Sequence, residues 1–159
     1  IEGEHFFFFF LFMQYITGVN SSLRVVASVT FPAGFTVTEW ADDADAIDIT
    51  VKDIAEGAMG AGANMVVWNV PKIIEMTINV IPDSNSDRNL QLLAQANTAV
   101  ANKLVAKDVI TATYVNQNSG AIQTFSNGAL TKAAPANSVA QSSRLKSKQY
   151  SFIFESTTT

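Results

Sequence analysis

The chain has no cysteine, a single histidine and only 15% charged residues. The lack of cysteine excludes a disulfide scaffold and a thiolate metal site. With one histidine and no evident carboxylate pair at a strand end, the chain has few side chains suited to nucleophilic, metal or acid–base catalysis. The 10 Lys and Arg stand against 14 Asp and Glu, a net charge of -4, which disfavours a domain that grips the phosphate backbone of nucleic acid. We therefore expect a protein that is not an enzyme and that carries no cofactor or metal.

Length and hydrophobic content bound the architecture. The chain has 159 residues, of which 48% are hydrophobic. This is enough for one domain with a real core and too little for two. The same hydrophobic content makes intrinsic disorder unlikely as a class for this chain.

The first 12 residues stand apart from the rest. They contain an unbroken apolar run from Phe6 to Phe12, preceded by Glu2 and Glu4 and by no Lys or Arg, which does not match a signal peptide. Seven residues are also too few to span a bilayer, which takes about 20. Two interpretations stay open for residues 1–12: an extension upstream of a native start at Met13, or an arm buried against a neighbouring subunit. Residues 13–159 form a single predicted domain.

Alternation of apolar and polar residues predicts mostly strands after Met13. Asn20–Phe31 and Phe35–Trp40 are predicted to form a hairpin across a turn at Pro32-Ala33-Gly34. The acidic stretch Ala41–Asp48 is predicted to be a long loop. Ala55–Ala63, which contains three glycines, is predicted to be a flexible connection.

The middle of the chain carries the most hydrophobic strand candidates and one helix. Asn64–Val70 and Ile73–Ile81 are the expected central strands. A helix is predicted over about residues 86–104, capped by Ser84 or Ser86. Its expected buried stripe consists of Leu90, Leu93, Ala94, Asn97, Ala101 and Leu104.

The last third of the chain returns to strands. Val109–Val115 and Ala121–Phe125 are predicted to form a second hairpin, followed by a turn at Asn127-Gly128. Ala129–Ser143 is predicted to be a polar connection, and Tyr150–Glu155 a closing strand. One helix beside many strands predicts an α+β fold, mainly β, dominated by an antiparallel sheet.

Several patterns resemble functional motifs but fit a simpler interpretation better. Asp42, Asp43, Asp45 and Asp48 resemble a calcium loop, yet counting from Asp43 the required glycine at position six and glutamate at position twelve are missing. A solvated or interface loop is the better interpretation. Gly57–Gly62 lacks the Lys-Ser/Thr of a phosphate-binding loop.

The isolated histidine and the tryptophans point to no chemistry either. His5 lies in the N-terminal extension without a partner that would make it catalytic. Trp40 and Trp68 have no basic neighbours in sequence, so they are expected to be core or interface anchors instead of stacking platforms for bases.

A set of short segments, taken in order, resembles a known family, the tail tube proteins of contractile-tailed bacteriophages. The same superfold occurs in type VI secretion and pyocin tubes. The resemblance covers about Tyr15 to Glu155 and excludes the N-terminal extension. None of its segments is catalytic, so its specificity rests on their number and order. The segments are Tyr15–Ser22, Ala27–Phe35, Glu39–Asp45, Ala58–Gly60, Asn79–Pro82, Asp87–Leu90, Asp108–Ala112, Ser126–Gly128 and Arg144–Lys148.

The resemblance implies a sandwich or barrel-like domain of two packed antiparallel sheets with one flanking helix. Hexameric rings of such subunits would stack into the inner tube of a contractile tail, which conducts the genome. The implied partners are further copies of the chain, the tail sheath protein, and baseplate and tail-terminator proteins. DNA would pass through the lumen without specific binding, and no membrane is involved. The implied location is the virion tail, assembled in the host bacterial cytoplasm.

Two alternatives remain open at this stage. A tube of a type VI secretion system or of a headless contractile particle would share the fold and the rings. A small-ligand-binding β-domain would instead need an enclosed pocket with a few convergent polar groups.

Charge placement supplies the candidate contact residues. Glu39–Glu56 holds seven acids and one base, whereas Arg144–Lys148 holds three bases and no acid. We expect the acidic loop of one subunit to dock near the basic segment of a neighbour; pairing within one chain, or two independent solvated loops, is the alternative. The outer face of the helix is expected to meet the sheath. The subunit-interface candidates are Glu39, Asp42, Asp43, Asp45, Asp48, Arg144, Lys146 and Lys148, and the sheath-facing candidates are Arg88, Gln91, Gln95 and Lys103.

Overall fold

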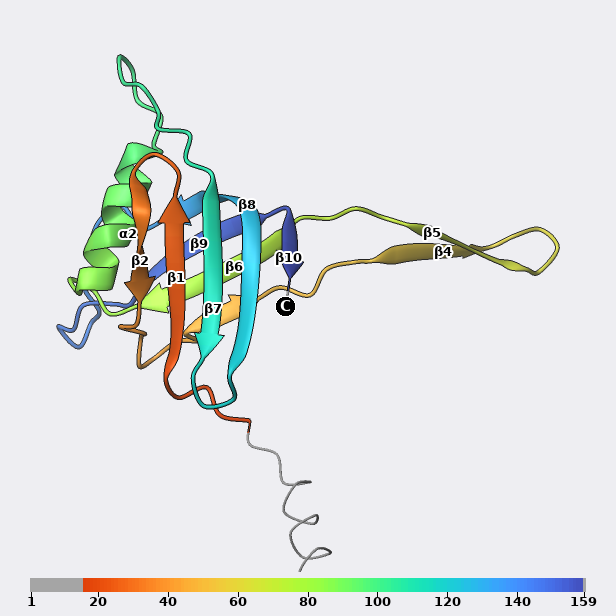
Figure 1. Cartoon of the computed structure of the whole chain (residues 1–159), viewed down its shortest axis with the longest axis horizontal. Helices are drawn as coiled ribbons and strands as arrows, with labels where there is room; N and C mark the ends of the chain where they lie inside the picture. The colour runs from red at the N-terminus through yellow and green to blue at the C-terminus, as the bar shows by residue number, and fades with distance from the viewer. Residues whose placement is uncertain (1–15, 159) are drawn as a thin grey trace, which may run out of the picture.

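The structure is a computed structural model that describes residues 16–158. The predictions for the Phe-rich extension, for His5 and for Tyr15 fall outside the described residues. The described part forms a body of two β-sheets with one helix at its side, and a long hairpin that projects away from the body (Figure 1).

The first sheet contains the strands β1 (Ser21–Ala27), β2 (Phe31–Val37), β7 (Ile110–Asn116), β8 (Ala121–Ala133) and β10 (Ser156–Thr158). Its order is β2-β1-β7-β8, with β10 paired to the first half of β8, and every pairing is antiparallel. The predicted hairpin of residues 109–115 and 121–125 is confirmed as β7 and β8.

The second sheet begins in the other half of β8. It continues through β9 (Lys148–Phe154) and β6 (Ile74–Val80) to the short strand β3 (Ile47–Ile49), again with antiparallel pairs. The two sheets lie in separate layers and share β8 (Figure 1). The prediction of an α+β, mainly β fold with two packed antiparallel sheets is therefore confirmed.

The strand β8 changes sheets at a bulge where a turn was predicted. Asn127 has a φ of 53°, and the ladder with β7 shifts register there. Gly128 packs so closely on the Phe154 ring that a Cβ atom would lie 2.3 Å from it. The turn predicted at Asn127-Gly128 is wrong because this packing keeps the strand running, and bulges are how strands pass from one sheet to another. The connection predicted from Ala129 therefore begins only after Ala133.

The core lies between the two sheets. Alternate residues of β1, β6 and β9 point into it, as period-two patterning requires, and β2, β7 and β8 add further buried side chains. Phe125 from the first sheet stands 5.3 Å, centroid to centroid, from Phe154 of the second, which ties the layers together. The largest fully buried side chains are Tyr150, Phe125, Phe152, Phe154, Leu23, Met76, Ile78, Leu90, Leu93, Ile110, Val25 and Val37.

The helix, labelled α2, spans Asn85–Ala96 and is shorter than the predicted 86–104. It ends because Asn97 and Thr98 satisfy the last-turn carbonyls with their side chains: Asn97 Nδ2 donates to Leu93 O at 2.9 Å, and Thr98 Oγ1 donates to Ala94 O at 2.6 Å. Leu104 is consequently 96% exposed instead of lying on the buried stripe. Leu90 and Leu93 are buried as predicted.

The first hairpin also turns at a different place. The strands β1 and β2 are joined by residues 28–30, whereas Pro32-Ala33-Gly34 lies inside β2. Gly34 has a φ of 78°, a conformation that glycine adopts without strain, and the ladder shifts register nearby. The turn is held by the distant Asp108, described below, which local sequence does not reveal.

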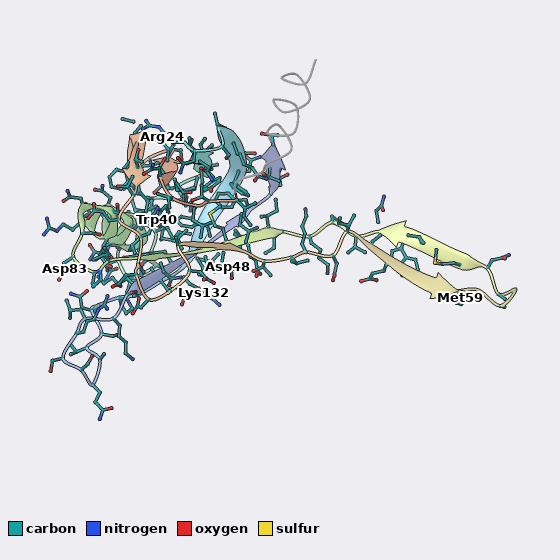
Figure 2. All side chains as sticks on the ribbon, turned by 90° about the horizontal axis from the view of Figure 1, so that it is seen from below. Arg24, Trp40, Asp48, Met59, Asp83 and Lys132 are labelled. Carbon is teal, nitrogen blue, oxygen red and sulfur yellow. The ribbon has the colours of Figure 1, made fainter. Side chains whose placement is uncertain are left out.

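The projecting hairpin consists of β4 (Ala55–Met59) and β5 (Met65–Asn69), which pair only with each other. It replaces the flexible connection predicted for Ala55–Ala63. The strand predicted for Asn64–Val70 is present as β5, but it is not central, because it pairs only with β4. The strand predicted for Ile73–Ile81 is confirmed as β6, which has neighbours on both sides. We call residues 51–73 the arm; it leaves the body between β3 and β6 (Figures 1 and 2).

Candidate assembly surfaces

The arm is shaped by its own sequence. Met65–Asn69 is rich in residues that favour strands, and it pairs in continuous register with Ala55–Met59. The tip closes when Gly60 N donates to Asn64 O at 2.7 Å and Ala63 N to Gly60 O at 3.0 Å. Near the body, Val70 N donates to Ile54 O at 2.9 Å and continues the pairing.

The arm is exposed and apolar at the same time. All ten residues of β4 and β5 are exposed, and Glu56 is the one charged residue among them. The large hydrophobic side chains of residues 54–69 are 46% to 73% exposed. A contiguous apolar surface of this kind marks an interaction site in a native protein. These exposed side chains are Ile54, Met59, Met65, Val66, Val67 and Trp68.

The acidic loop and the basic segment meet within one chain. The Arg144 guanidinium forms an ion pair with Asp42, and the Ser147 hydroxyl donates to the Asp43 carboxylate. The hydrogen bond from Arg144 holds the pKa of the Asp42 carboxyl below its usual range. Both members of the ion pair are well exposed. The pairing within one chain that the sequence left open is therefore present, and docking to a neighbour stays a prediction.

The remaining subunit-interface candidates differ in how far they are exposed. Asp45, Asp48 and Lys146 are exposed, while Glu39 is half-buried and accepts a backbone hydrogen bond from Ile81 N at 3.0 Å. Lys148 differs from all of them because it is only 7% exposed. The assignment of Lys148 to a surface between subunits is corrected, because its side chain is buried within its own chain.

Lys148 belongs to a buried polar cluster between the helix and the second sheet. Its Nζ lies 3.2 Å from the Asp87 carboxylate, and the Tyr150 hydroxyl donates to the same carboxylate at 2.7 Å. Burial, then the hydrogen bond to Asp87 and its charge, raise the pKa of Tyr150. Charges are rarely this buried unless paired. The cluster therefore fixes α2 on β9.

Asp87 also organises the start of the helix. Ser84 is the N-cap; its hydroxyl accepts from Asp87 N at 3.2 Å and donates to Ile81 O at 2.8 Å. The Asp87 carboxylate in turn accepts from Asp83 N at 2.9 Å. This reciprocal arrangement is close to a capping box, of which the sequence analysis had named Ser84 as a candidate cap. The contacts of Asp87 with Lys148 and Tyr150 had no sequence signal.

The predicted sheath-facing residues differ in how far they are exposed, and their contact with a sheath stays a prediction. Arg88 and Gln95 are exposed on α2. Gln91 is half-buried because it follows Asp87 by one turn; its Oε1 lies 3.1 Å from the Tyr150 hydroxyl. Lys103 lies beyond the helix and donates from Nζ to the Gln95 carbonyl.

A second buried carboxylate, Asp108, was missed by the sequence analysis. It accepts from Val29 N at 2.7 Å, from Thr30 N at 2.9 Å and from Asn97 Nδ2 at 2.8 Å, and also from the Thr30 hydroxyl. Burial raises its pKa, but the hydrogen bonds from Thr30, Asn97 and Val29 outweigh this, so the pKa lies below its usual value. Asp108 thus joins the β1–β2 turn to the end of α2.

Residues 16–158 offer neither a metal-binding cluster nor a membrane-spanning helix. No group of three or more His, Cys, Asp or Glu side chains there is arranged to hold a metal ion. Within the same residues no helix is both long enough and apolar enough to cross a membrane.

Comparison with known proteins adds a family and a fold. Among proteins with curated descriptions, none matches this chain. The tube-terminating cap of the anti-feeding prophage is similar with a TM-score of 0.53 and 15% identity, over 92% of this chain and 91% of that one. A chain of the PVC sheath-tube complex, from an extracellular contractile injection system in its extended state, is similar with a TM-score of 0.51 and 15% identity, over 92% of each. At this identity the likeness concerns the fold.

The family match covers residues 14–158 and carries the description "Tail fiber protein gp32". This description agrees with the expected tail component and names a fibre where the sequence resemblance pointed to a tube. With nearly the whole chain matched, the protein belongs to the phage tail family described as tail fiber protein gp32.

Proposed function

We propose that this chain is a ring-forming subunit whose hexamers stack into the inner tube of a contractile tail and conduct the genome. The tail location in this proposal comes from the family, and the arrangement in rings from the fold shared with proteins of contractile injection systems. It is a structural role without catalysis, and the further partners would be the sheath, the baseplate and the tail terminator.

The observation that carries the proposal is the arm. A two-stranded hairpin by itself is marginally stable in water, and this one exposes large apolar side chains along its whole length. Such a ribbon becomes stable when another chain covers it. A stack of identical subunits supplies that cover for every arm except those at the end of the stack.

The remaining surface suits the same plan. Arg88 and Gln95 give the outer side of α2 a polar face that would meet the sheath. Asp45, Asp48 and Lys146 are exposed charges that would help to fix register between subunits. The net charge of -4 fits a lumen through which DNA passes without being held.

A second candidate is a ring that ends a tube instead of extending it. It is favoured by the fold shared with the tube-terminating cap of the anti-feeding prophage, whose TM-score is close to that of the sheath-tube chain. A terminating ring would form single rings that do not stack. A tube of a secretion system or of a headless contractile particle is a further alternative, and effector genes beside the gene, in place of capsid and portal genes, would favour it.

The test is the state of the purified full chain. Light scattering gives its mass, and negative-stain imaging shows rings, tubes or neither. Stacked rings support the tube subunit, and single rings at all concentrations support the terminator. A monomer at high concentration contradicts both and would favour a small-ligand-binding domain.

A further inference from the structure

The arm has two faces, and the register of its strands defines them. Residues directly opposite each other in an antiparallel pair lie on the same face. Met59 pairs with Met65 and Gly57 with Val67, whereas Ala58 pairs with Val66 and Glu56 with Trp68. We call the first the Met face and the second the Trp face. The Met face consists of Ala55, Gly57, Met59, Met65, Val67 and Asn69, and the Trp face of Glu56, Ala58, Val66 and Trp68.

Both faces are apolar, which is unusual for a hairpin. An antiparallel hairpin that lies on one surface shows apolar residues on the covered face and polar residues on the other. Here Met65 is 71% exposed and Val67 54% exposed on the Met face, while Val66 is 54% exposed and Trp68 46% exposed on the Trp face. Strands whose two faces are both apolar are typically covered on both sides.

From this we propose that the arm is clamped between two neighbouring copies of the chain, one of which covers the Met face and the other the Trp face. The inference rests on the proposed function, which makes further copies of this chain the available partners. It adds a statement about geometry: the arm inserts at a seam between two adjacent subunits instead of resting on the outside of one.

The physical argument for a copy of the same chain comes from reach and composition. The arm projects well away from its own body, and its tip, marked by Met59, is the part of the described chain farthest from the core in Figure 2. It therefore reaches past its own subunit. Glu56 is the one charge in the two strands, and the other charges of the arm, Lys52, Asp53 and Lys72, lie at its ends next to β3 and β6. The projecting strands therefore offer no pattern of charge for a charged partner.

The exposed apolar surface of the arm extends over both strands. Five large hydrophobic residues in the two strands, with Ile54 beside them, are about half to three-quarters exposed. Because each subunit would both insert its arm and receive the arms of others, the contact is heterologous and repeats along the stack.

Single cysteines make the test free of background, because the chain has none. Val66→Cys places a thiol on the Trp face, and Val67→Cys places one on the Met face. Each variant is labelled with a maleimide in the dispersed state and in the assembled state, and labelling after unfolding gives the total thiol. Ala58→Cys and Met59→Cys repeat the comparison at a second position on each face.

The expected result is fast labelling of both faces in the dispersed protein and labelling slowed about tenfold or more on both faces after assembly. If the protein assembles but one face stays as reactive as in the dispersed state, the arm lies on a single surface. That outcome overturns the clamp and leaves the proposed function standing. If neither the wild-type chain nor the variants assemble, the proposed function fails, and the clamp fails with it.

Discussion

The body and the arm differ in how far their large hydrophobic side chains are buried. In the body, Phe152 and Phe154 are 1% exposed between two sheets, and even the charges of Asp87 and Lys148 are enclosed and paired. In the arm, Trp68 is 46% exposed. The body therefore buries its core aromatic side chains within one chain, whereas the arm leaves its large apolar side chains exposed. This difference supports the proposal that the body carries the fold and the arm carries the contacts between subunits.

Removal of the arm is expected to have the largest effect, because it should abolish assembly and leave the body folded. Replacing residues 52–73 by Asn-Gly would keep the β3–β6 register and join the two strands by a tight two-residue hairpin turn. We expect a folded monomer with an unchanged thermal midpoint and no rings or tubes, because the arm adds nothing to the core. Thermal unfolding and light scattering measure the two properties. Assembly of the shortened chain as efficient as that of the full chain would refute the role of the arm.

Two aromatic-to-alanine substitutions, one in the body and one in the arm, test the same difference in burial. Phe152→Ala is expected to lower the free energy of unfolding of the dispersed protein by about 3–5 kcal/mol, because it opens a cavity between the sheets. Trp68→Ala is expected to change it by about 0.5 kcal/mol or less and to weaken assembly instead. Urea unfolding of both variants checks this. Equal losses of stability would show that the arm is part of the folding core.

Two lysines that sit close together in sequence test the buried cluster. Lys148→Met should lower the free energy of unfolding by about 3 kcal/mol, because it leaves the Asp87 carboxylate buried without its cation. Lys146→Met, at an exposed position, is the matched control and should have almost no effect. Denaturant midpoints of the two variants give the answer, and similar midpoints would contradict the structural role of Lys148.

The Asp108 anchor predicts a smaller, pH-dependent effect. Its pKa in the folded protein is below the ordinary value near 3.9, so its stabilising contribution is present above that value and is lost as the pH falls through the folded pKa. Asp108→Asn should therefore cost about 1–2 kcal/mol at pH 7 and less at pH 3. Urea midpoints of both proteins at the two pH values measure it. A cost that stays constant from pH 7 to pH 3 would mean that the carboxylate charge is not involved.

The sequence predicted the body better than the arm. The hairpin of β7 and β8, the strand β6 and the start of the helix at Ser84 follow from alternation and capping, which are local signals. The end of the helix and the β1–β2 turn depend on Asp108, which lies 11 residues from Asn97 and 78 from Thr30. Gly128 continues a strand because it meets the Phe154 ring. Contacts between residues so far apart in sequence produce no periodic pattern from which they could be predicted.

The candidate contact residues show the same division. Charge runs correctly drew attention to Asp42 and Arg144 as partners, although the pair found here lies within one chain. Charge alone did not separate Lys148, which is buried, from Lys146, which is exposed. In the arm, the hydrophobic strand Met65–Asn69 was indistinguishable from a core strand, since a segment buried by another chain has the composition of one buried by its own.

The most direct test of the account is amide hydrogen exchange of the arm before and after assembly. In dispersed protein the backbone amides of Ala55–Met59 and Met65–Asn69 should exchange fast, because an uncovered two-stranded hairpin opens readily, while those of β6 and β9 should be protected. In assembled protein the account predicts strong protection of the arm and little change in the body. An arm that exchanges equally fast in both states would contradict the claim that assembly covers it.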